Sequence, residues 1–395
     1  MAENNTITLS LEGRIDSHNA ADVEKSLLAS ADEHPNADIV LDAEKLQYIS
    51  SAGLRVLMKL RKRSKKAIPV VNVSSEVYDI FEVTGFTELF DVKKRLREIS
   101  VEGCEFVGSG GYGHVYRIDP ETIVKIYNPG ISLEFVQQER DTSQKAFLMG
   151  VPTAISYDVV KCGESYGVVY EMLNAQTIAQ IISKNPERIP EITGKAAELL
   201  KSLHQIVPGQ DSGLPNRKQQ ILELFNELAK YLTESEAEKV RTFINNNIPD
   251  RNTFLHGDYN SKNIMVRDGE FQLIDIGDAS IGHPVFDILG LMLVYIILPQ
   301  TTVGNYTEEQ KRGLLGFDFK YAPEVWRTMC STYFGLSTQE EVDAVAKKLM
   351  PYCMLLASVY GFRLNGNSPE MCKALVSYFR ERTLPLIDTA HPIDF

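Results

Sequence analysis

The stretch His256-Gly257-Asp258-Tyr259-Asn260-Ser261-Lys262-Asn263, followed by Asp275-Ile276-Gly277, is the part of the chain around which the rest is organised. Between the two, residues 264–266 and 271–274 have the apolar character of short strands, and residues 267–270 have the composition of a turn. A hairpin of this kind would bring Asn263 and Asp275 side by side. The pattern therefore predicts a loop and a strand end that present polar side chains to one point.

Asp258, Asn263 and Asp275 have the chemistry of a site that handles phosphate. Asp258 can accept a proton from a hydroxyl group. Asn263 and Asp275 can hold Mg²⁺ between them, with the phosphate oxygens of a nucleotide completing the coordination shell. The alternative is that all three are polar loop residues that cap strands, and only the remainder of the chain can separate the two interpretations.

Composition excludes several classes of protein. The chain has 395 residues, 44% of them hydrophobic, which suits two or three domains, and its net charge of −12 argues against a general binder of nucleic acid or anionic membranes. The five cysteines form no C-x-x-C pair, which favours reduced thiols in a cytoplasmic protein. The first residues lack the features of a signal peptide, and the longest apolar run, 286–299, is too short to span a bilayer.

The first hundred residues alternate between strand and helix patterns, which predicts a small α/β layer domain. Strands are expected at 6–11, 38–41 and 68–73, each followed by an amphipathic helix. Ser50 and Ser51 open the second of these helices, where either hydroxyl can bind the free backbone N–H groups. The outer face of that helix is basic and can serve as a docking face or simply face solvent.

These residues also resemble the STAS domain of bacterial anti-sigma factor antagonists. The resemblance lies in Leu11–Asp16, Val40–Asp42 and Tyr48–Leu54 and covers roughly residues 4–97. It implies that Ser51 is a phosphorylated switch in a signalling pathway, with an anti-sigma factor or a kinase as the partner. Many members carry Asp before this serine, whereas this chain has Ser50. The alternative is that both serines are only helix caps.

Residues 92–100 are charged and have a helical pattern, which predicts a linker helix between two domains. The alternative is that they belong to the last element of the first domain. We expect the first domain to span residues 1–97 and the second to span residues 98–395.

The second domain begins with a glycine-rich stretch, residues 106–116, that contains G-x-G-x-x-G-x-V. Such glycines let a backbone fold close over phosphates and offer N–H groups to them. A dinucleotide-binding turn would need a helix next. Here residues 115–118 and 122–127 are two further strands, and the second carries Lys125. Strand, glycine loop, strand, turn and lysine-bearing strand is the order found in kinases.

Lys125 needs a carboxylate to hold it in the cleft. The helix predicted over residues 132–149 offers Glu139, favoured by its distance along the chain, and Glu134 as the other choice. A later strand ends in Glu171-Met172-Leu173, where the hinge of a kinase would offer backbone groups to adenine.

Taken together, these motifs and Gly282–Asp287 resemble the aminoglycoside phosphotransferase and choline kinase group, and protein kinases more distantly. The resemblance covers about residues 101–380 and implies an α+β, two-lobed protein-kinase-like fold, with an N-lobe over about 101–173 and a C-lobe over about 174–395. It implies ATP and Mg²⁺ as cofactors, Asp258 as the catalytic base, Asn263 and Asp275 as metal ligands, and Asp287 as a brace for the catalytic loop. The implied nucleotide-binding positions are Gly108, Ser109, Gly110, Gly111, Tyr112, Gly113, Val115, Lys125, Glu171, Met172 and Leu173, and the catalytic set adds Glu139.

Two departures from protein kinases bear on the substrate. Gly257 stands where protein kinases have an arginine that senses phosphate on the activation loop, and only residues 278–281 separate Asp275-Ile276-Gly277 from Gly282-His283-Pro284. This favours a small hydroxyl acceptor over a peptide. Residues 98–395 carry a net charge of −11, which fits a cationic acceptor. The alternatives are a protein kinase that acts on Ser51 or a partner, and a nucleotide-binding signalling scaffold.

Overall fold

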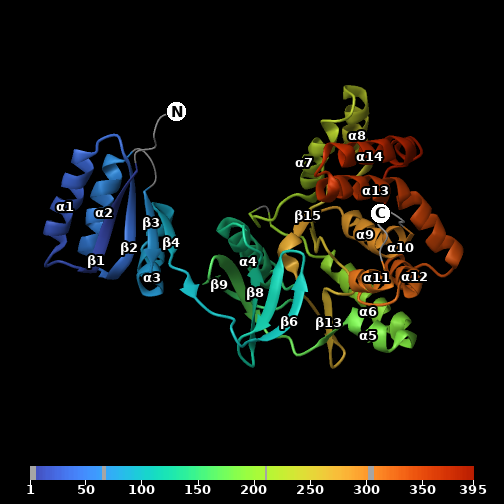
Figure 1. Ribbon diagram of the computed structural model, residues 1–395, viewed down its shortest axis with the longest axis horizontal. Coiled ribbons are helices and arrows are strands. Elements are labelled where there is room, and N and C mark those ends of the chain that lie inside the picture. The colour runs from blue at the N-terminus through green and yellow to red at the C-terminus, as the bar shows by residue number, and fades with distance from the viewer. Residues whose placement is uncertain (1–5, 65–67, 210, 301–306) are drawn as a thin grey trace. The chain divides into compact units, whose positions relative to one another are not determined.

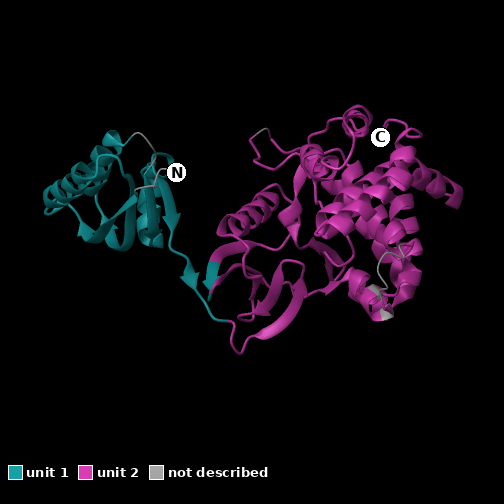
Figure 2. Cartoon of the chain, turned by 45° about the horizontal axis from the view of Figure 1, so that its top comes forward, with its two compact units in different colours: residues 1–100, 160–163 teal, residues 101–159, 164–395 magenta. Residues whose placement is uncertain are grey.

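The computed structural model describes residues 6–64, 68–209, 211–300 and 307–395. The chain divides into two compact units, which Figure 2 colours separately. The first consists of residues 1–100 with 160–163, and the second of residues 101–159 with 164–395.

The first unit is a four-stranded parallel sheet with helices, as the alternating pattern predicts. Its strand order is β1-β2-β3-β4. Leu41 and Val70 on the strands and Leu60 on a helix have no exposed surface, so one apolar core joins sheet and helices. The elements are β1 (Thr6–Ile15), α1 (Ala20–Glu33), β2 (Asp38–Ile49), α2 (Ser51–Arg63), β3 (Pro69–Val73), α3 (Ser75–Val83) and β4 (Asp91–Lys94).

The predicted linker helix over residues 92–100 is wrong. Residues 91–94 form β4, which pairs in parallel with β3, and β5 (Arg97–Glu98) pairs in parallel with residues 160 and 161. Both segments complete their backbone hydrogen bonds against a neighbouring strand. Charged side chains are common on edge strands, where they discourage further pairing, and this explains a composition that also suits a helix.

The second unit begins with an antiparallel sheet on which α4 (Leu133–Leu148) packs (Figure 1). The strand order is β5-β9-β10-β8-β7-β6, with the short β5 at one edge. The strands are β6 (Glu105–Gly110), β7 (Gly113–Arg117), β8 (Thr122–Tyr127), β9 (Ser156–Cys162) and β10 (Ser165–Glu171).

The remainder of the second unit is mostly helical and surrounds one large apolar core, as predicted. Two small sheets, β11-β13-β14 and β12-β15, lie within it and carry the candidate site. Among the described residues, no helix combines the length and apolar character needed to cross a membrane. The elements are β11 (Gln176–Thr177), α5 (Ile178–Lys184), α6 (Ile189–Leu203), α7 (Arg217–Ala229), α8 (Glu234–Asn247), β12 (Thr253–Leu255), β13 (Ile264–Arg267), β14 (Glu270–Leu273), β15 (Ser280–Gly282), α9 (Val285–Met292), α10 (Leu298–Gln300), α11 (Glu308–Leu315), α12 (Ala322–Phe334), α13 (Gln339–Asn365), α14 (Pro369–Tyr378) and α15 (Leu384–Ile387).

Candidate active site

The predicted hairpin between Asn263 and Asp275 is present. Strands β13 and β14 pair in antiparallel fashion, and Asp268 and Gly269 at the turn both have positive φ angles, of 51° and 85°. Two left-handed residues are what a tight two-residue hairpin turn requires. The Ile274 N–H donates to the Asn263 carbonyl at 3.0 Å. The two ends of the hairpin, which carry Asn263 and Asp275, are therefore adjacent.

Asp258 lies in the loop between β12 and β13 and is held by two asparagines. The Asn263 amide nitrogen donates to Asp258 Oδ2 at 2.8 Å and to the Asp258 carbonyl at 2.9 Å, and the Asn260 amide nitrogen donates to Oδ1 at 2.9 Å. Asp258 can be reached by solvent but is closely surrounded by protein. This partial burial raises the pKa of its carboxyl group, although both asparagine hydrogen bonds act in the opposite direction.

Lys125 makes ion pairs with two carboxylates. Its Nζ lies 2.7 Å from Glu139 Oε1 and 2.8 Å from Asp275 Oδ1. Burial acts to lower the pKa of Lys125, but the Asp275 and Glu139 charges together outweigh it, so the pKa is raised and the side chain stays protonated. The partner of Lys125 on α4 is therefore Glu139 and not Glu134. Glu139 is also the residue that the distance along the chain from Lys125 favours.

The backbone around Asp275 is shaped by these contacts. Asp275 has a φ of 59° and a ψ of 52°, a left-handed conformation that aspartate tolerates better than most residues. A Cβ atom on Gly277 would lie 2.4 Å from Glu139 Cγ. The glycine two residues after Asp275 is therefore required because α4 packs directly against this segment.

The glycine-rich stretch forms the β6–β7 hairpin, with Gly110 opposite Gly113. Its tip is anchored by Asn128, whose N–H donates to the Tyr112 carbonyl at 2.8 Å. A Cβ atom added to Gly108, Gly110 or Gly111 would meet nothing within 4 Å. The protein itself does not require glycine at these three positions. Their bare backbone instead suits a ligand that approaches closely.

The segment predicted to contact adenine is partly occupied by the protein. The Met172 N–H donates to the Glu121 carbonyl at 2.7 Å, and the Glu171 carboxylate accepts from the Ile155 N–H at 3.3 Å. Neither of these two groups is free for a base in this structure. Any adenine contact at residues 171–173 must therefore use the remaining backbone groups of this segment.

Asp287 braces the catalytic loop, as its position predicts. Its carboxylate accepts from the N–H groups of His256 and Gly257, both at 2.9 Å, and is 2% exposed. Burial acts to raise the pKa of Asp287. The hydrogen bond and the charge of His204 are the main opposing contacts, and the net result is a pKa below the usual value. The N-cap of α9 is Pro284, so Asp287 lies inside the helix and its carboxylate does not cap it.

Sequence reasoning missed the residue behind this brace. His204, at the end of α6, lies 3.2 Å through Nε2 from Asp287 and 2.7 Å through Nδ1 from the Tyr333 hydroxyl. The three side chains come from three helices that are far apart in the sequence. No local pattern marks such a contact, although His204 is a buried polar residue that directly follows an amphipathic helix.

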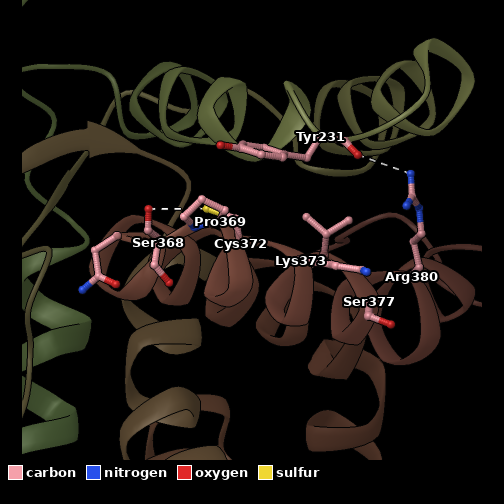
Figure 3. Close-up of a pocket in the computed structure, with 10 residues that line it drawn as sticks. Tyr231, Ser368, Pro369, Cys372, Lys373, Ser377 and Arg380 are labelled. Carbon is pink, nitrogen blue, oxygen red and sulfur yellow. Dashed lines mark hydrogen bonds between the residues drawn. The ribbon is translucent and has the colours of Figure 1, made fainter.

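A separate pocket of about 560 Å³ lies between Tyr231 and helix α14 (Figure 3). Its lining contains none of the predicted site residues. The Tyr231 ring forms one wall, and Cys372 and Lys373 lie on α14 opposite it. Arg380, just beyond the end of α14, donates through Nη2 to the Tyr231 carbonyl at 3.3 Å. Arg380 is already paired with Glu236, whose carboxylate Oε1 lies 2.7 Å from its Nε.

Ser51 in the first unit is placed differently from expectation. Ser50 is the N-cap of α2, and its hydroxyl oxygen accepts from the Ala52 N–H at 3.2 Å, whereas Ser51 is the first helical residue and is exposed. The cap is thus Ser50 alone. Two cations of the basic face of α2 are paired, Lys59 with Glu24 and Arg63 with Asp32.

Comparisons with known proteins agree with this division of the chain. Residues 103–327, more than half of the chain, match the family described as phosphotransferase enzyme family, and residues 2–99 match the STAS domain family. The putative anti-sigma factor antagonist BtrV of Bordetella bronchiseptica is 35% identical over 85 residues, which are 21% of this chain and 72% of that protein.

Solved structures with a similar backbone are more distant. ADP-bound aminoglycoside phosphotransferase APH(2'')-Ib is 18% identical, with a TM-score of 0.47 over 72% of this chain and 93% of that one. A choline/ethanolamine kinase family protein from Mesorhizobium loti is 17% identical, with a TM-score of 0.41 over 73% of this chain and 92% of that one. From the two family matches, the chain belongs to the phosphotransferase enzyme family, is a kinase-type phosphotransferase, and carries an N-terminal STAS domain of the anti-sigma factor antagonist type.

Proposed function

We propose that residues 98–395 transfer the γ-phosphoryl group of ATP to a hydroxyl of a small acceptor. The observation that carries this proposal is the convergence of Asp258, Asn263, Asp275 and the Lys125–Glu139 pair at one site, next to a glycine loop with open backbone. This set provides a proton acceptor, two oxygen ligands and a fixed cation, which are the parts that phosphoryl transfer needs.

The residues present fit Mg²⁺ and a nucleotide. Because the Asn263 amide nitrogen is committed to Asp258, its amide oxygen remains as a ligand, and the Asp275 carboxylate supplies the second. Bound Mg²⁺ would neutralise the charge on the β- and γ-phosphates. Lys125 would hold the α- and β-phosphates, residues 108–113 would lie over them, and Val115 would contact the nucleotide.

Asp258 would act as the base for the acceptor hydroxyl. Its two oxygens are fixed by Asn260 and Asn263, so the carboxylate is already oriented. A raised pKa makes it a better proton acceptor than an ordinary aspartate. The brace from Asp287 fixes the loop on the other side.

The acceptor is proposed to be a small hydroxyl compound that carries positive charge, such as an amino sugar or an amino alcohol. Residues 278–281 are too few to form a long activation segment. The net charge of −11 over residues 98–395 favours a cation near the site. Helices of the C-lobe would complete the acceptor pocket.

For the STAS domain, we propose that Ser51 accepts a phosphate from a separate kinase and that its charge alters binding to an anti-sigma factor or similar partner. The exposed hydroxyl of Ser51 is open to modification, and a phosphate at the start of α2 would be compatible with the helix. Self-phosphorylation is disfavoured because the site lacks a long segment for a peptide. After incubation with Mg-ATP, intact mass should stay unchanged. A gain of one phosphate that disappears in both Ser51→Ala and Asp258→Asn would instead make this chain a self-phosphorylating switch.

The test of the phosphotransferase activity is an ATP-consumption screen over amines, amino sugars, amino alcohols and purified candidate partner proteins. Acceptor-dependent consumption by the wild type that is lost in Asp258→Asn supports the proposal. Consumption only with a partner protein would replace it with a protein kinase. Nucleotide binding without turnover on any acceptor class would favour a signalling scaffold.

A further inference from the structure

Arg217, the first residue of α7, is a buried arginine beside the catalytic segments. Its side chain is 8% exposed. The guanidinium Nε donates to Ser280 Oγ at 3.1 Å, and Nη2 donates to the Asp278 carbonyl. Both partners lie in the short segment that follows Asp275-Ile276-Gly277.

The same guanidinium also lies against the catalytic loop. Gly257 has a φ of 88°, and a Cβ atom built on it would lie 2.1 Å from Arg217 Nη2. The arginine thus occupies the space in which a side chain at position 257 would begin. Gly257 directly precedes Asp258, so one side chain touches both the loop with the proposed base and the segment with the proposed metal ligand.

The backbone next to Arg217 holds the same segment. The Ile281 N–H donates to the Pro215 carbonyl at 2.8 Å, and Asn216 forms a β-bridge with Ile281. On its other side, β15 pairs with β12, with Leu255 opposite Ser280. Residues 278–282 are therefore held between the strand that leads into the catalytic loop and the turn that begins α7.

Among the residues that the structure describes, Arg217 has no carboxylate as an ion-pair partner. Its polar neighbours are the Ser280 hydroxyl, the Asp278 carbonyl and the Tyr360 phenol. Burial raises the pKa of the nearby Tyr360 phenol on α13, and Arg217 acts against this rise. Burying a cation without a carboxylate partner is unfavourable for folding, so its presence at this point calls for a functional reason.

We propose that Arg217 is a positioning residue that ties the segment bearing Asp275 to the loop bearing Asp258. This link would hold the two segments together without phosphorylation of either one. The inference rests on the proposed phosphotransferase function. The tether fixes the metal ligand relative to the base without contacting nucleotide. Its loss should lower turnover while nucleotide binding persists, because the glycine loop and Lys125 are untouched.

The experiment compares Arg217→Met and Arg217→Lys with a matched control, Lys218→Met. Lys218 is equally buried on the same helix, but it pairs with the exposed Asp250 at 2.7 Å. Arg217→Met is expected to lower kcat by about tenfold or more, with Mg-ATP affinity within about threefold of wild type. Arg217→Lys should recover part of kcat, and Lys218→Met should match the wild type.

Hydrogen exchange gives a readout that does not depend on activity. In Arg217→Met, the amides of Gly257 and Ile281 should exchange about tenfold faster than in the wild type or in Lys218→Met. If kcat of Arg217→Met stays within twofold, or Lys218→Met loses as much, the proposal is wrong. If Arg217→Met does not fold, Arg217→Lys decides: reduced kcat at unchanged Tm supports the tether, and unchanged kcat overturns it.

The two proposals can fail separately. If Asp258→Asn leaves turnover unchanged, or no acceptor is found, the phosphotransferase assignment of the site fails. Faster exchange at Gly257 and Ile281 would still establish the tether itself. Wild-type exchange at both amides would refute the tether whatever the activity.

Discussion

Two glycines of the β6–β7 hairpin should respond in opposite ways to the same substitution. Neither Gly110 nor Gly113 has a positive φ, so alanine fits the backbone at both. A Cβ atom on Gly113 would lie 2.1 Å from the Ile126 carbonyl oxygen and 2.9 Å from Tyr127 Cα, whereas one on Gly110 would meet nothing within 4 Å. Gly113 is thus required by packing of β7 on β8, and Gly110 is not.

Gly113→Ala should destabilise the protein by about 1–3 kcal/mol or more, because backbone must move to admit the methyl group. Gly110→Ala should change stability by no more than about 0.5–1 kcal/mol, and in the stabilising direction if the unfolded chain loses freedom. If the loop covers phosphates, the methyl group of Gly110→Ala would lie between the backbone and the phosphates. Holding them apart would weaken a charge-assisted N–H contact of about 1.5–3 kcal/mol, which corresponds to at least tenfold in nucleotide Kd.

The assay measures Tm and the Kd of Mg-ATP for both variants and the wild type. Reduced affinity with unchanged Tm in Gly110→Ala, and reduced Tm in Gly113→Ala, are the expected results. If Gly110→Ala binds nucleotide within twofold of wild type, the backbone of this loop does not approach the phosphates. If Gly113→Ala keeps the wild-type Tm, the packing argument for β7 on β8 is incorrect.

Three further predictions follow from the site. Asp258→Asn should lower turnover by about two orders of magnitude or more with nucleotide binding nearly intact, since it removes the proton acceptor alone; turnover within threefold of wild type would exclude Asp258 as the base. Asn263→Ala and Asp275→Asn should weaken Mg²⁺-dependent nucleotide binding, whereas Lys125→Ala should weaken binding at every Mg²⁺ concentration; titrations with and without Mg²⁺ distinguish these, and an unchanged metal dependence in both ligand variants would refute the assignment. Because the pKa of Asp258 is raised and the base must be ionised, kcat should fall with decreasing pH at a midpoint above about 4, the value of an ordinary aspartate; a pH–rate profile that stays flat to pH 4 would contradict this.

Local patterns account for the parts of the site that sequence reasoning placed well. The turn at Asp268-Gly269 and its two flanking apolar runs are contiguous in the chain, so the hairpin that joins Asn263 to Asp275 could be predicted. The strand with Lys125 and the helix with Glu139 are also neighbours in sequence. Their 2.7 Å ion pair follows from helix periodicity and one short connection.

Contacts between distant segments account for what was missed. Arg217 lies against Gly257, and His204 contacts Asp287, which holds the same loop from behind. Both residues precede this loop by about 40–50 residues, and nothing local distinguishes them from solvated or core residues. The prediction of a linker helix over residues 92–100 was wrong for a related reason. The charge pattern of these residues suits a helix, but they form strands because they pair with β3 and with residues 160–161. At Ser50-Ser51, the residue type was right, but only the backbone shows which hydroxyl caps α2.

The arrangement around Lys125 also bears on how nucleotide and metal would bind. Asp275 is paired with Lys125 through Oδ1 here, so Mg²⁺ held by this carboxylate would compete with the lysine for its negative charge. Metal alone would leave the mostly buried Lys125 with only Glu139, whereas a nucleotide supplies phosphate oxygens to replace the lost carboxylate. Glu139 is 7% exposed and held by α4 against Gly277, so it can keep Lys125 in place during the exchange. The geometry therefore favours cooperative binding of Mg²⁺ with nucleotide, because the phosphate oxygens would compensate Lys125 for the Asp275 charge that the metal draws away.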